Sequence, residues 1–238
     1  MTDPKWMDRV LQLVQIGSPI ILLDDVKERE GDLFCAASVA TPEVLQFMVR
    51  RGSGLLCMSQ PRARLEDIGI PRMSEGLELL SRYVGFQSPR DGFSYSVAAW
   101  HKFLISLVGR LSETPFHFPV DLVKHESGIS VVERLETIQA LLEPEATMDW
   151  FTTPGHLFTL GAHAEGMKGR WGHTEASVDL CRAAGLPPAG LLCEIVGDDG
   201  SMLRGEDLEA FAAETNVEIL TVSAVPELLN RQAEAIPA

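Results

Sequence analysis

The stretch EGDLFCAASVATPEVLQFMVRRGSGLLCMS, residues 30–59, carries the pattern that decides the fold class. Residues 31–40 form an apolar run typical of a buried strand, and residues 54–59 form a second one. Between them, Thr41 supplies a capping hydroxyl and is followed by a proline and an acid, as at many helix starts. We therefore expect a strand, a helix that ends at Gly52, and another strand.

Strand and helix patterns alternate on both sides of this stretch. Further strands are expected at residues 19–25, 93–100, 189–196 and 217–223, and helices at residues 6–14, 64–68, 130–143, 174–184, 206–216 and 224–232. Because the alternation is irregular, the sequence predicts an α+β (α/β-type) fold in which a mixed β-sheet is packed with helices. No glycine-, serine- or proline-rich linker divides the chain, so we expect residues 1–238 to form a single domain.

The composition fits a protein with a large core and no polyanionic partner. The chain has 238 residues, 45% of them apolar, and a formal net charge of −14. This acidic balance, without a lysine- or arginine-rich run, argues against binding to nucleic acid or to an anionic membrane. We find neither a signal peptide nor an apolar stretch of membrane-spanning length. The four cysteines form no close metal-binding pair, so we expect buried, reduced thiols and a cytoplasmic location.

A charged loop, DDVKEREGD at residues 24–32, follows the first predicted strand. Its five carboxylates, with Lys27 and Arg29 among them, have the chemistry to hold a divalent cation and a polyol. A solvated surface loop explains the same composition equally well.

The stretch RWGHT at residues 170–174 lies directly ahead of a helical run. We expect Thr174 to cap the helix, whose first backbone N–H groups lack partners within the helix. With Arg170 one step upstream, these groups would form a cradle for an anion or a phosphate. The simpler interpretation of the stretch alone is an ordinary capped helix with an exposed arginine and histidine.

Two further positions carry polar groups beside apolar strands. In TPGH, residues 153–156, we expect proline and glycine to form a tight turn that presents His156, although a lone histidine is usually structural. Glu194 is embedded in the apolar run AGLLCEIV, where a carboxylate is costly unless it is paired or functional. Together, the carboxylates, the histidines and the phosphate cradle suggest metal-assisted proton transfer on a small phosphorylated compound.

Taken in order, these motifs resemble the 3,4-dihydroxy-2-butanone 4-phosphate synthase family of riboflavin biosynthesis. The resemblance covers most of the chain and is closest at residues 30–57 and 154–202. The family patterns E-G-D, P-G-H, R-x-G-H-T-E-A and C-E-x-x-x-D-D-G stand here as EGD, PGH, RWGHTEA and CEIVGDDG. Several motifs in one order are far more specific than any one alone, so the resemblance implies the synthase fold.

The resemblance also implies an activity and an assembly. The family are lyases that convert ribulose 5-phosphate to 3,4-dihydroxy-2-butanone 4-phosphate and formate, with Mg²⁺, by enolisation, dehydration and skeletal rearrangement. They are homodimers whose active sites lie near the subunit interface. An imidazole ligand would make Mn²⁺ suitable as well as Mg²⁺.

Residue by residue, the family roles pass to positions that match its motifs. They are metal binding for Glu28 and His173; phosphate binding for Arg170, Gly172 and Thr174; proton transfer for His156 and Glu194; and catalytic positions close to the substrate for Glu30 and Asp32. Lys27, at the position of a family arginine, is expected to bind the substrate as well.

The departures from the family pattern gather at the substrate end. Lys27 and Thr153 replace family arginines, Glu126 begins a changed T-T-G motif, and an atypical insertion is expected around residues 101–123. Trp171 stands where the family has a small residue, and we expect its indole to narrow the phosphate end of the pocket. A repurposed enzyme for another phosphorylated sugar in a specialised pathway therefore remains an alternative, and a non-catalytic ligand-binding member is a third.

Overall fold

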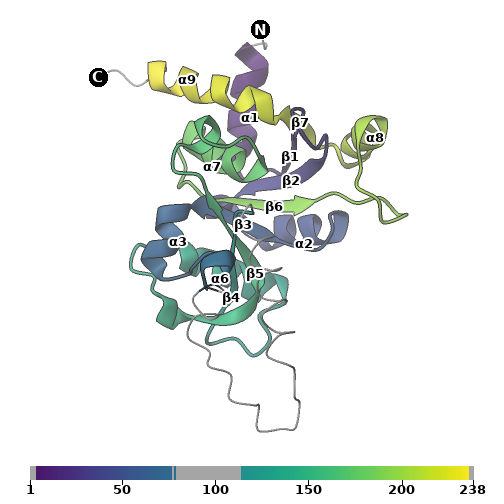
Figure 1. Cartoon of the computed structure of the whole chain (residues 1–238). Coiled ribbons are helices and arrows are strands. Elements are labelled where there is room, and N and C mark those ends of the chain that lie inside the picture. The colour runs from purple at the N-terminus through teal and green to yellow at the C-terminus, as the bar shows by residue number, and fades with distance from the viewer. Residues whose placement is uncertain (1–3, 77, 79–113, 236–238) are drawn as a thin grey trace.

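The computed structural model describes residues 4–76, 78 and 114–235, and within them a seven-stranded mixed sheet (Figure 1). The strands are β1 (Ile20–Leu23), β2 (Gly31–Ala36), β3 (Cys57–Pro61), β4 (Phe116–Leu122), β5 (Phe151–Ala162), β6 (Gly190–Glu194) and β7 (Glu218–Thr221). The helices that position the site or cover the sheet are α1 (Pro4–Gln15), α2 (Pro42–Arg51), α3 (Arg62–Ile68), α6 (Val131–Leu142), α7 (His173–Ala183), α8 (Gly205–Thr215) and α9 (Val225–Ala235).

The sheet combines parallel and antiparallel pairs, in the order β4-β5-β3-β6-β2-β1-β7. β1 pairs with β7, and β3 with β5, in parallel, whereas the other neighbours are antiparallel. The mixed sheet predicted from the sequence is therefore confirmed.

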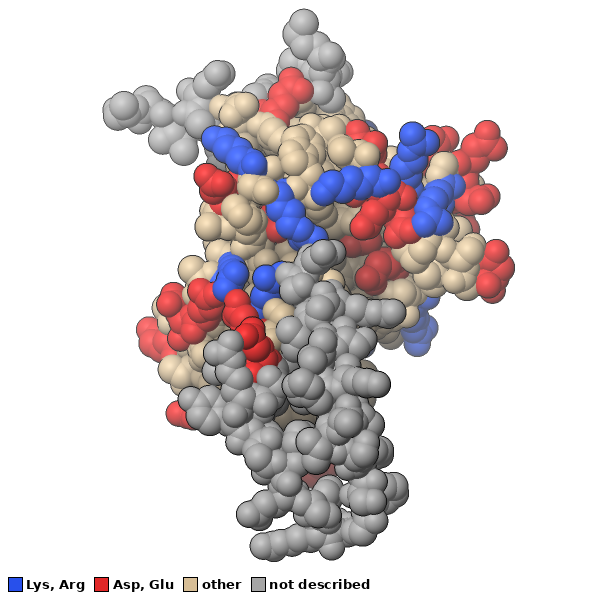
Figure 2. All heavy atoms as spheres, viewed as in Figure 1, with Lys and Arg blue, Asp and Glu red and all other residues tan. Residues whose placement is uncertain are grey.

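Helices cover both faces of the sheet. Successive side chains of a strand point to opposite faces, so Ile21 and Leu33 pack in one apolar core while Ile20 and Phe34 pack in the other. Figure 1 shows α1, α7 and α9 together on one side of the sheet and α2, α3 and α6 on the other. Acidic and basic side chains are intermixed on the face seen in Figure 2.

The local helix signals act as their chemistry predicts. The Thr41 hydroxyl accepts a hydrogen bond from the Val44 N–H at 3.4 Å, and α2 ends before Gly52. At the start of α6, Ser130 and Glu133 cap each other's backbone N–H groups at 3.2 Å. The described helices are all too short or too polar to cross a membrane.

Two local predictions are wrong. α7 begins at His173, with Gly172 as its N-cap and no side-chain cap, so Thr174 lies inside the helix. TPGH is not a tight turn but part of β5, with a cis bond between Thr153 and the following proline. Its glycine serves close strand packing, because a Cβ at Gly155 would lie 2.1 Å from the carbonyl carbon of Val120.

The segment expected to be an insertion, residues 101–123, ends in regular structure. Its last part contains β4, which pairs with β5 at an edge of the described sheet, where Pro119 is tolerated. Residues 101–113, and the strand predicted at 93–100, lie outside the described residues. The insertion itself stays a prediction.

Candidate active site

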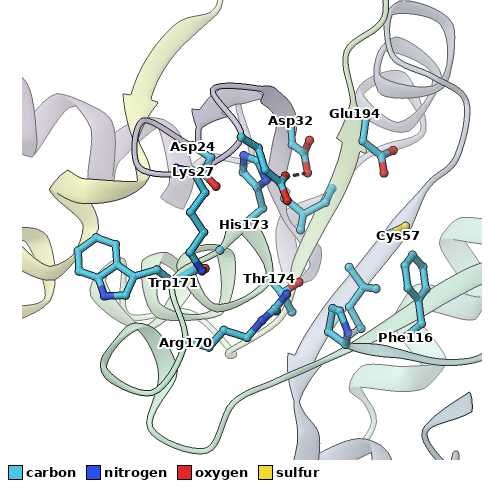
Figure 3. Close-up of a pocket in the computed structure, with 15 residues that line it drawn as sticks. Asp24, Lys27, Asp32, Cys57, Phe116, Arg170, Trp171, His173, Thr174 and Glu194 are labelled. Atoms are coloured by element: carbon cyan, nitrogen blue, oxygen red, sulfur yellow. Dashed lines mark hydrogen bonds and ion pairs between the residues drawn. The ribbon is translucent and has the colours of Figure 1, made fainter. Parts of the chain in front are cut away.

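A cavity of about 220 Å³ opens between the loop after β1, the start of α7 and the ends of β2 and β6 (Figure 3). It brings together eight of the ten predicted site residues. These are Lys27, Glu28, Asp32, Arg170, Gly172, His173, Thr174 and Glu194. Carboxylates gather at one end of the cavity, and Arg170 and Thr174 lie at the other.

Strand pairing explains why the two acids of the sheet are neighbours. Asp32 in β2 lies directly opposite Glu194 in β6 in the antiparallel register. The first residue of α7 completes the group, since His173 Nδ1 lies 3.7 Å from Asp32 Oδ2. Residues far apart in sequence thus meet at one sheet end, where a helix begins.

The buried carboxyl of this group is Asp32, which is 7% exposed. Burial raises the pKa of Asp32 to about 7, the charge of His173 opposes the rise, and the nearby carboxylates of Glu194, Glu28 and Glu30 add to it. A carboxyl group with such a pKa can both accept and release a proton at neutral pH.

Glu194 is less embedded than its sequence context predicts. It is the last residue of β6 and only half-buried. The Ser53 hydroxyl donates a hydrogen bond to Glu194 Oε2 at 3.1 Å, and the Ser53 N–H donates to the Glu194 carbonyl oxygen at 2.7 Å. Ser53 is thus a positioning residue that was not predicted, because no motif or local pattern marks it.

The charged loop is held in shape by its own backbone. Asp24 Oδ1 accepts hydrogen bonds from the N–H groups of Val26 and Lys27, both at 2.9 Å. Burial tends to raise the pKa of Asp24, but these backbone hydrogen bonds outweigh it and the pKa is lowered. The Lys27 ammonium donates to the Trp171 carbonyl oxygen at 3.1 Å and so joins the two sides of the cavity mouth.

The phosphate cradle predicted at the start of α7 has the expected donors. No side chain caps the helix, so its first N–H groups are available to a ligand. Arg170 is held beside them, because its Nη1 lies 3.1 Å from Oε2 of Glu175, whose side chain is 1% exposed. Glu175 also accepts a hydrogen bond from the His163 N–H at 3.0 Å.

The Trp171 indole lies at the edge of the cavity. Trp171 is one of the residues that line the cavity, and Figure 3 shows its indole pointing away from Arg170 and Thr174. It is 38% exposed and lines an outer groove with Pro226 and Leu229 near the start of α9.

We therefore expect Trp171→Ala to change stability more than substrate binding. The KM for a sugar phosphate should stay within about twofold, whereas the free energy of unfolding should fall by about 1 kcal/mol as packing against α9 is lost. Initial rates and urea unfolding of the same preparation check this. A large change in KM with an unchanged free energy of unfolding would contradict this prediction and would mean that the indole contributes to substrate binding.

Glu30 and His156 are not brought to the cavity. Glu30 forms an ion pair with Arg204 instead. His156 lies in β5 with 46% of its side chain exposed. β3 lies between β5 and β6 in the sheet order, so His156 in β5 and Glu194 in β6 are on strands two spacings apart, roughly 10 Å.

The imidazole of His156 is nevertheless oriented for chemistry. Its Nδ1–H donates to Asp121 Oδ2 at 2.7 Å, and its backbone N–H donates to Asp121 Oδ1 at 2.9 Å. This arrangement fixes the tautomer and leaves Nε2 as the free ring nitrogen. Asp121 was not singled out from the sequence, because only the pairing of β4 with β5 brings it to His156.

The residues around His173 fit a hard divalent cation. His173 Nε2 is buried and has no hydrogen-bond partner among the described residues. Glu28 lines the same cavity on the exposed loop. In the described part of the chain no three potential ligands already form a complete cage. Mg²⁺ needs no such cage, because it usually takes one or two protein ligands and completes its shell with water or substrate oxygens.

Comparison with known proteins places the chain in a family. The sequence profile of 3,4-dihydroxy-2-butanone 4-phosphate synthase matches residues 8–228. The synthase of Bordetella pertussis is 36% identical over 234 residues, covering 98% of this chain and 89% of the relative. The synthase of Pseudomonas aeruginosa is 36% identical over 218 residues, covering 91% of this chain and 52% of the relative. The chain thus spans about half the length of some relatives, among them the riboflavin biosynthesis protein RibBA of Salinispora tropica, at 48%.

Solved structures agree. A crystal structure of 3,4-dihydroxy-2-butanone 4-phosphate synthase in cation-free form superposes with a TM-score of 0.73 at 30% identity, covering 94% of this chain and 97% of that one. Another, in complex with two magnesium ions, gives a TM-score of 0.69 at 31% identity, covering 91% and 93%. The chain belongs to the 3,4-dihydroxy-2-butanone 4-phosphate synthase family.

Proposed function

We propose that this chain converts ribulose 5-phosphate to 3,4-dihydroxy-2-butanone 4-phosphate and formate. The observation that carries the proposal is the arrangement of one cavity. Asp32, Glu194 and His173 meet at one end, and Arg170 with the uncapped start of α7 forms the other. A phosphorylated sugar needs both ends, one for its phosphate and one for proton transfer along its carbon chain.

Mg²⁺, or Mn²⁺ in its place, is the proposed cofactor. Glu28 and His173 would hold it, as the orphaned Nε2 of His173 supports. When bound, the ion would polarise the carbonyl and hydroxyl oxygens of the sugar. A related solved structure contains magnesium.

Side chains and backbone groups of this chain would bind the phosphate, close the cavity mouth and transfer protons. Arg170, Gly172, Thr174 and the α7 N–H groups bind the phosphate, and Lys27 closes the cavity mouth over the sugar. A carboxylate of the Asp32–Glu194 pair removes the proton beside the carbonyl, and the other, once protonated, delivers a proton to the departing hydroxyl. The water lost in that step returns when formate leaves, so the reaction needs no other reactant.

We further propose a homodimer in which His156 serves the cavity of the partner subunit. Its distance from its own cavity, its exposure and its fixed tautomer support this role. Apolar side chains exposed near it, Leu55, Val123 and Trp150, suit a contact with a second copy. A cytoplasmic location is part of the proposal, since a small phosphorylated sugar is the substrate.

Mixed dimers test the role of His156. The His156→Ala and His173→Ala proteins should each be inactive, but refolding them together in equal amounts should restore about a quarter of wild-type formate release. Half of the dimers would then be mixed, and each would have one intact site. If His156 acts within its own chain, every site carries a defect and no activity returns.

Substrate preference tests the reaction itself. Formate release should be faster from ribulose 5-phosphate than from xylulose 5-phosphate, ribose 5-phosphate or other sugar phosphates at equal concentration. Metal-dependent turnover of another sugar phosphate, with none of ribulose 5-phosphate, would favour the repurposed enzyme. Thr153 keeps that alternative open, because it stands where the family has an arginine. Its hydroxyl donates a hydrogen bond to the Pro119 carbonyl oxygen at 2.9 Å, and it has no guanidinium to contact a substrate.

A further inference from the structure

A second, smaller cavity of about 90 Å³ lies beside the proposed active site. It has space for about three water molecules at liquid volume, and equally for one tetrahedral oxyanion. Its lining residues are Arg62, Arg72, Pro115, His117, Gly161, His163, Arg170 and Glu175. Pro115 and Arg170 also line the first cavity, so the two spaces are neighbours.

A buried histidine with an unpaired nitrogen lines this second cavity. His117 is 1% exposed, and its Nδ1–H donates to the Pro115 carbonyl oxygen at 3.1 Å. Nε2 has no hydrogen-bond partner in the part of the chain that the structure describes. Burial lowers the pKa of His117, and the charges of Arg62 and Arg72 lower it too, whereas the hydrogen bond to Pro115 and the charge of Glu75 oppose the shift. The ring is thus neutral, with the lone pair of Nε2 as its remaining acceptor.

Guanidinium groups from separate segments converge on the same space. Arg62 is fixed by Glu66 through Nε at 2.6 Å and by Glu75 through Nη2 at 2.7 Å. Arg170 is fixed by Glu175 through Nη1 alone. Each guanidinium has five N–H donors, so these pairs hold the group in place and leave further donors for a ligand.

Arg72 and the carboxylates complete the charge pattern. Arg72 Nε donates to the Thr114 carbonyl oxygen at 3.0 Å, which holds its guanidinium at the cavity wall. Of the carboxylates that balance the arginines, only Glu175 lines the cavity, while those of Glu66 and Glu75 are nearly half exposed. Three guanidinium groups thus line the cavity, and much of the negative charge that balances them lies outside it.

The space itself depends on a glycine. A Cβ at Gly161 would lie 2.3 Å from Cε1 of His117, so any side chain there would collide with the ring. Glycine therefore lets the His117 ring pack against the backbone of β5, and both residues line the cavity.

We propose that this second cavity binds a tetrahedral oxyanion that keeps one hydroxyl group, such as hydrogen phosphate or the singly protonated phosphate of a sugar. Arginine donors bind its oxygens, and its hydroxyl donates to Nε2 of His117. Sulfate has the same shape but lacks the hydroxyl at neutral pH, so phosphate is preferred. The proposal rests on the proposed function only where a sugar is the source of the phosphate, because the binding of inorganic phosphate requires no turnover.

Calorimetric titration of the protein of residues 1–238 with inorganic phosphate at pH 7 tests the proposal. We expect a phosphate site that persists in Thr174→Val, with sulfate bound there at least about tenfold more weakly, since a charge-assisted hydrogen bond is missing. Arg62→Gln, on an exposed side chain, should weaken phosphate binding about tenfold, and His117→Leu should abolish the preference over sulfate. Arg64→Gln is the matched control, because Arg64 lies on the same helix, does not line the second cavity, and within the described residues donates its hydrogen bonds to the carbonyl oxygens of Glu143 and Pro144.

Two results would overturn the proposal. No heat of binding at millimolar phosphate would mean that the cavity holds water only. Binding that survives Arg62→Gln but is lost in Thr174→Val would place the phosphate in the first cavity. Neither result bears on formate release by the wild-type protein, so a failure of this proposal can be told apart from a failure of the proposed reaction.

Competition identifies the source of the oxyanion. If the phosphate of a second sugar molecule occupies the second cavity, excess ribulose 5-phosphate displaces inorganic phosphate from it and Arg62→Gln weakens the binding of both. If free phosphate occupies it, both ligands bind together and Arg62→Gln leaves the KM for the sugar unchanged.

Discussion

His173→Ala should lower formate release at least about a thousandfold while the protein stays folded. The imidazole is the proposed metal ligand, and its loss removes the proposed interactions with the cation, which commonly contribute several kcal/mol to such reactions. Stability should hardly change, because Nε2 is buried without a partner and its removal breaks no hydrogen bond.

The measurement pairs formate release with calorimetric titration of Mg²⁺ or Mn²⁺. His125→Ala is a matched control, since His125 is also buried but pairs with Glu136 away from both cavities. We expect metal binding and activity to fall together in the His173 variant and to persist in the control. Full metal affinity in the His173 variant would contradict the ligand assignment.

Asp32→Asn should make the metal-free protein more stable at pH 8 and nearly inactive. The pKa of Asp32 is raised from 3.8 to about 7 by burial, so the folded state favours the protonated acid. The contribution of Asp32 to the free energy of unfolding is fully present below 3.8, the pKa of the group in the unfolded chain, and is lost as the pH rises toward 7. The shift corresponds to a cost of up to about 4 kcal/mol above pH 7, which asparagine removes.

Urea unfolding of the metal-free protein, with a chelator present, between pH 4 and pH 8 tests this prediction. The free energy of unfolding of the variant should exceed that of the wild type at pH 8, and the difference should vanish near pH 4. Activity should drop at least about a hundredfold with the loss of a proton-transfer group. Asp67→Asn, on an exposed side chain, should stay within about 0.5 kcal/mol of the wild type at every pH. Equal pH dependence in Asp32→Asn and the wild type would contradict the buried-acid assignment.

Local chemistry made much of the fold predictable. Thr41 and Gly52 bound α2 because capping and helix termination depend on adjacent residues. The same local reasoning failed at Thr153–His156, where proline and glycine resemble a turn. There the backbone of β4 lies so close that only glycine fits, and that contact involves residues far away in the sequence.

The candidate site, like the fold, could be predicted only in part. The motif match identified Glu28 and His173 as members, and the fold brings both to one cavity. Motifs do not carry burial, so the sequence pointed to Glu194 as the embedded acid, although Asp32 is the buried one. The partners of the catalytic candidates, such as Asp121 beside His156, follow from strand pairing alone.

Proton NMR of a single mixture tests the proposed conversion of ribulose 5-phosphate. Ribulose 5-phosphate, Mg²⁺ and the protein should give a formate signal and the methyl signal of 3,4-dihydroxy-2-butanone 4-phosphate, growing in equal amounts as the sugar disappears. Chelation of the metal should stop both signals. A sugar that stays intact with the metal-loaded protein, or a methyl signal without formate, would contradict the account.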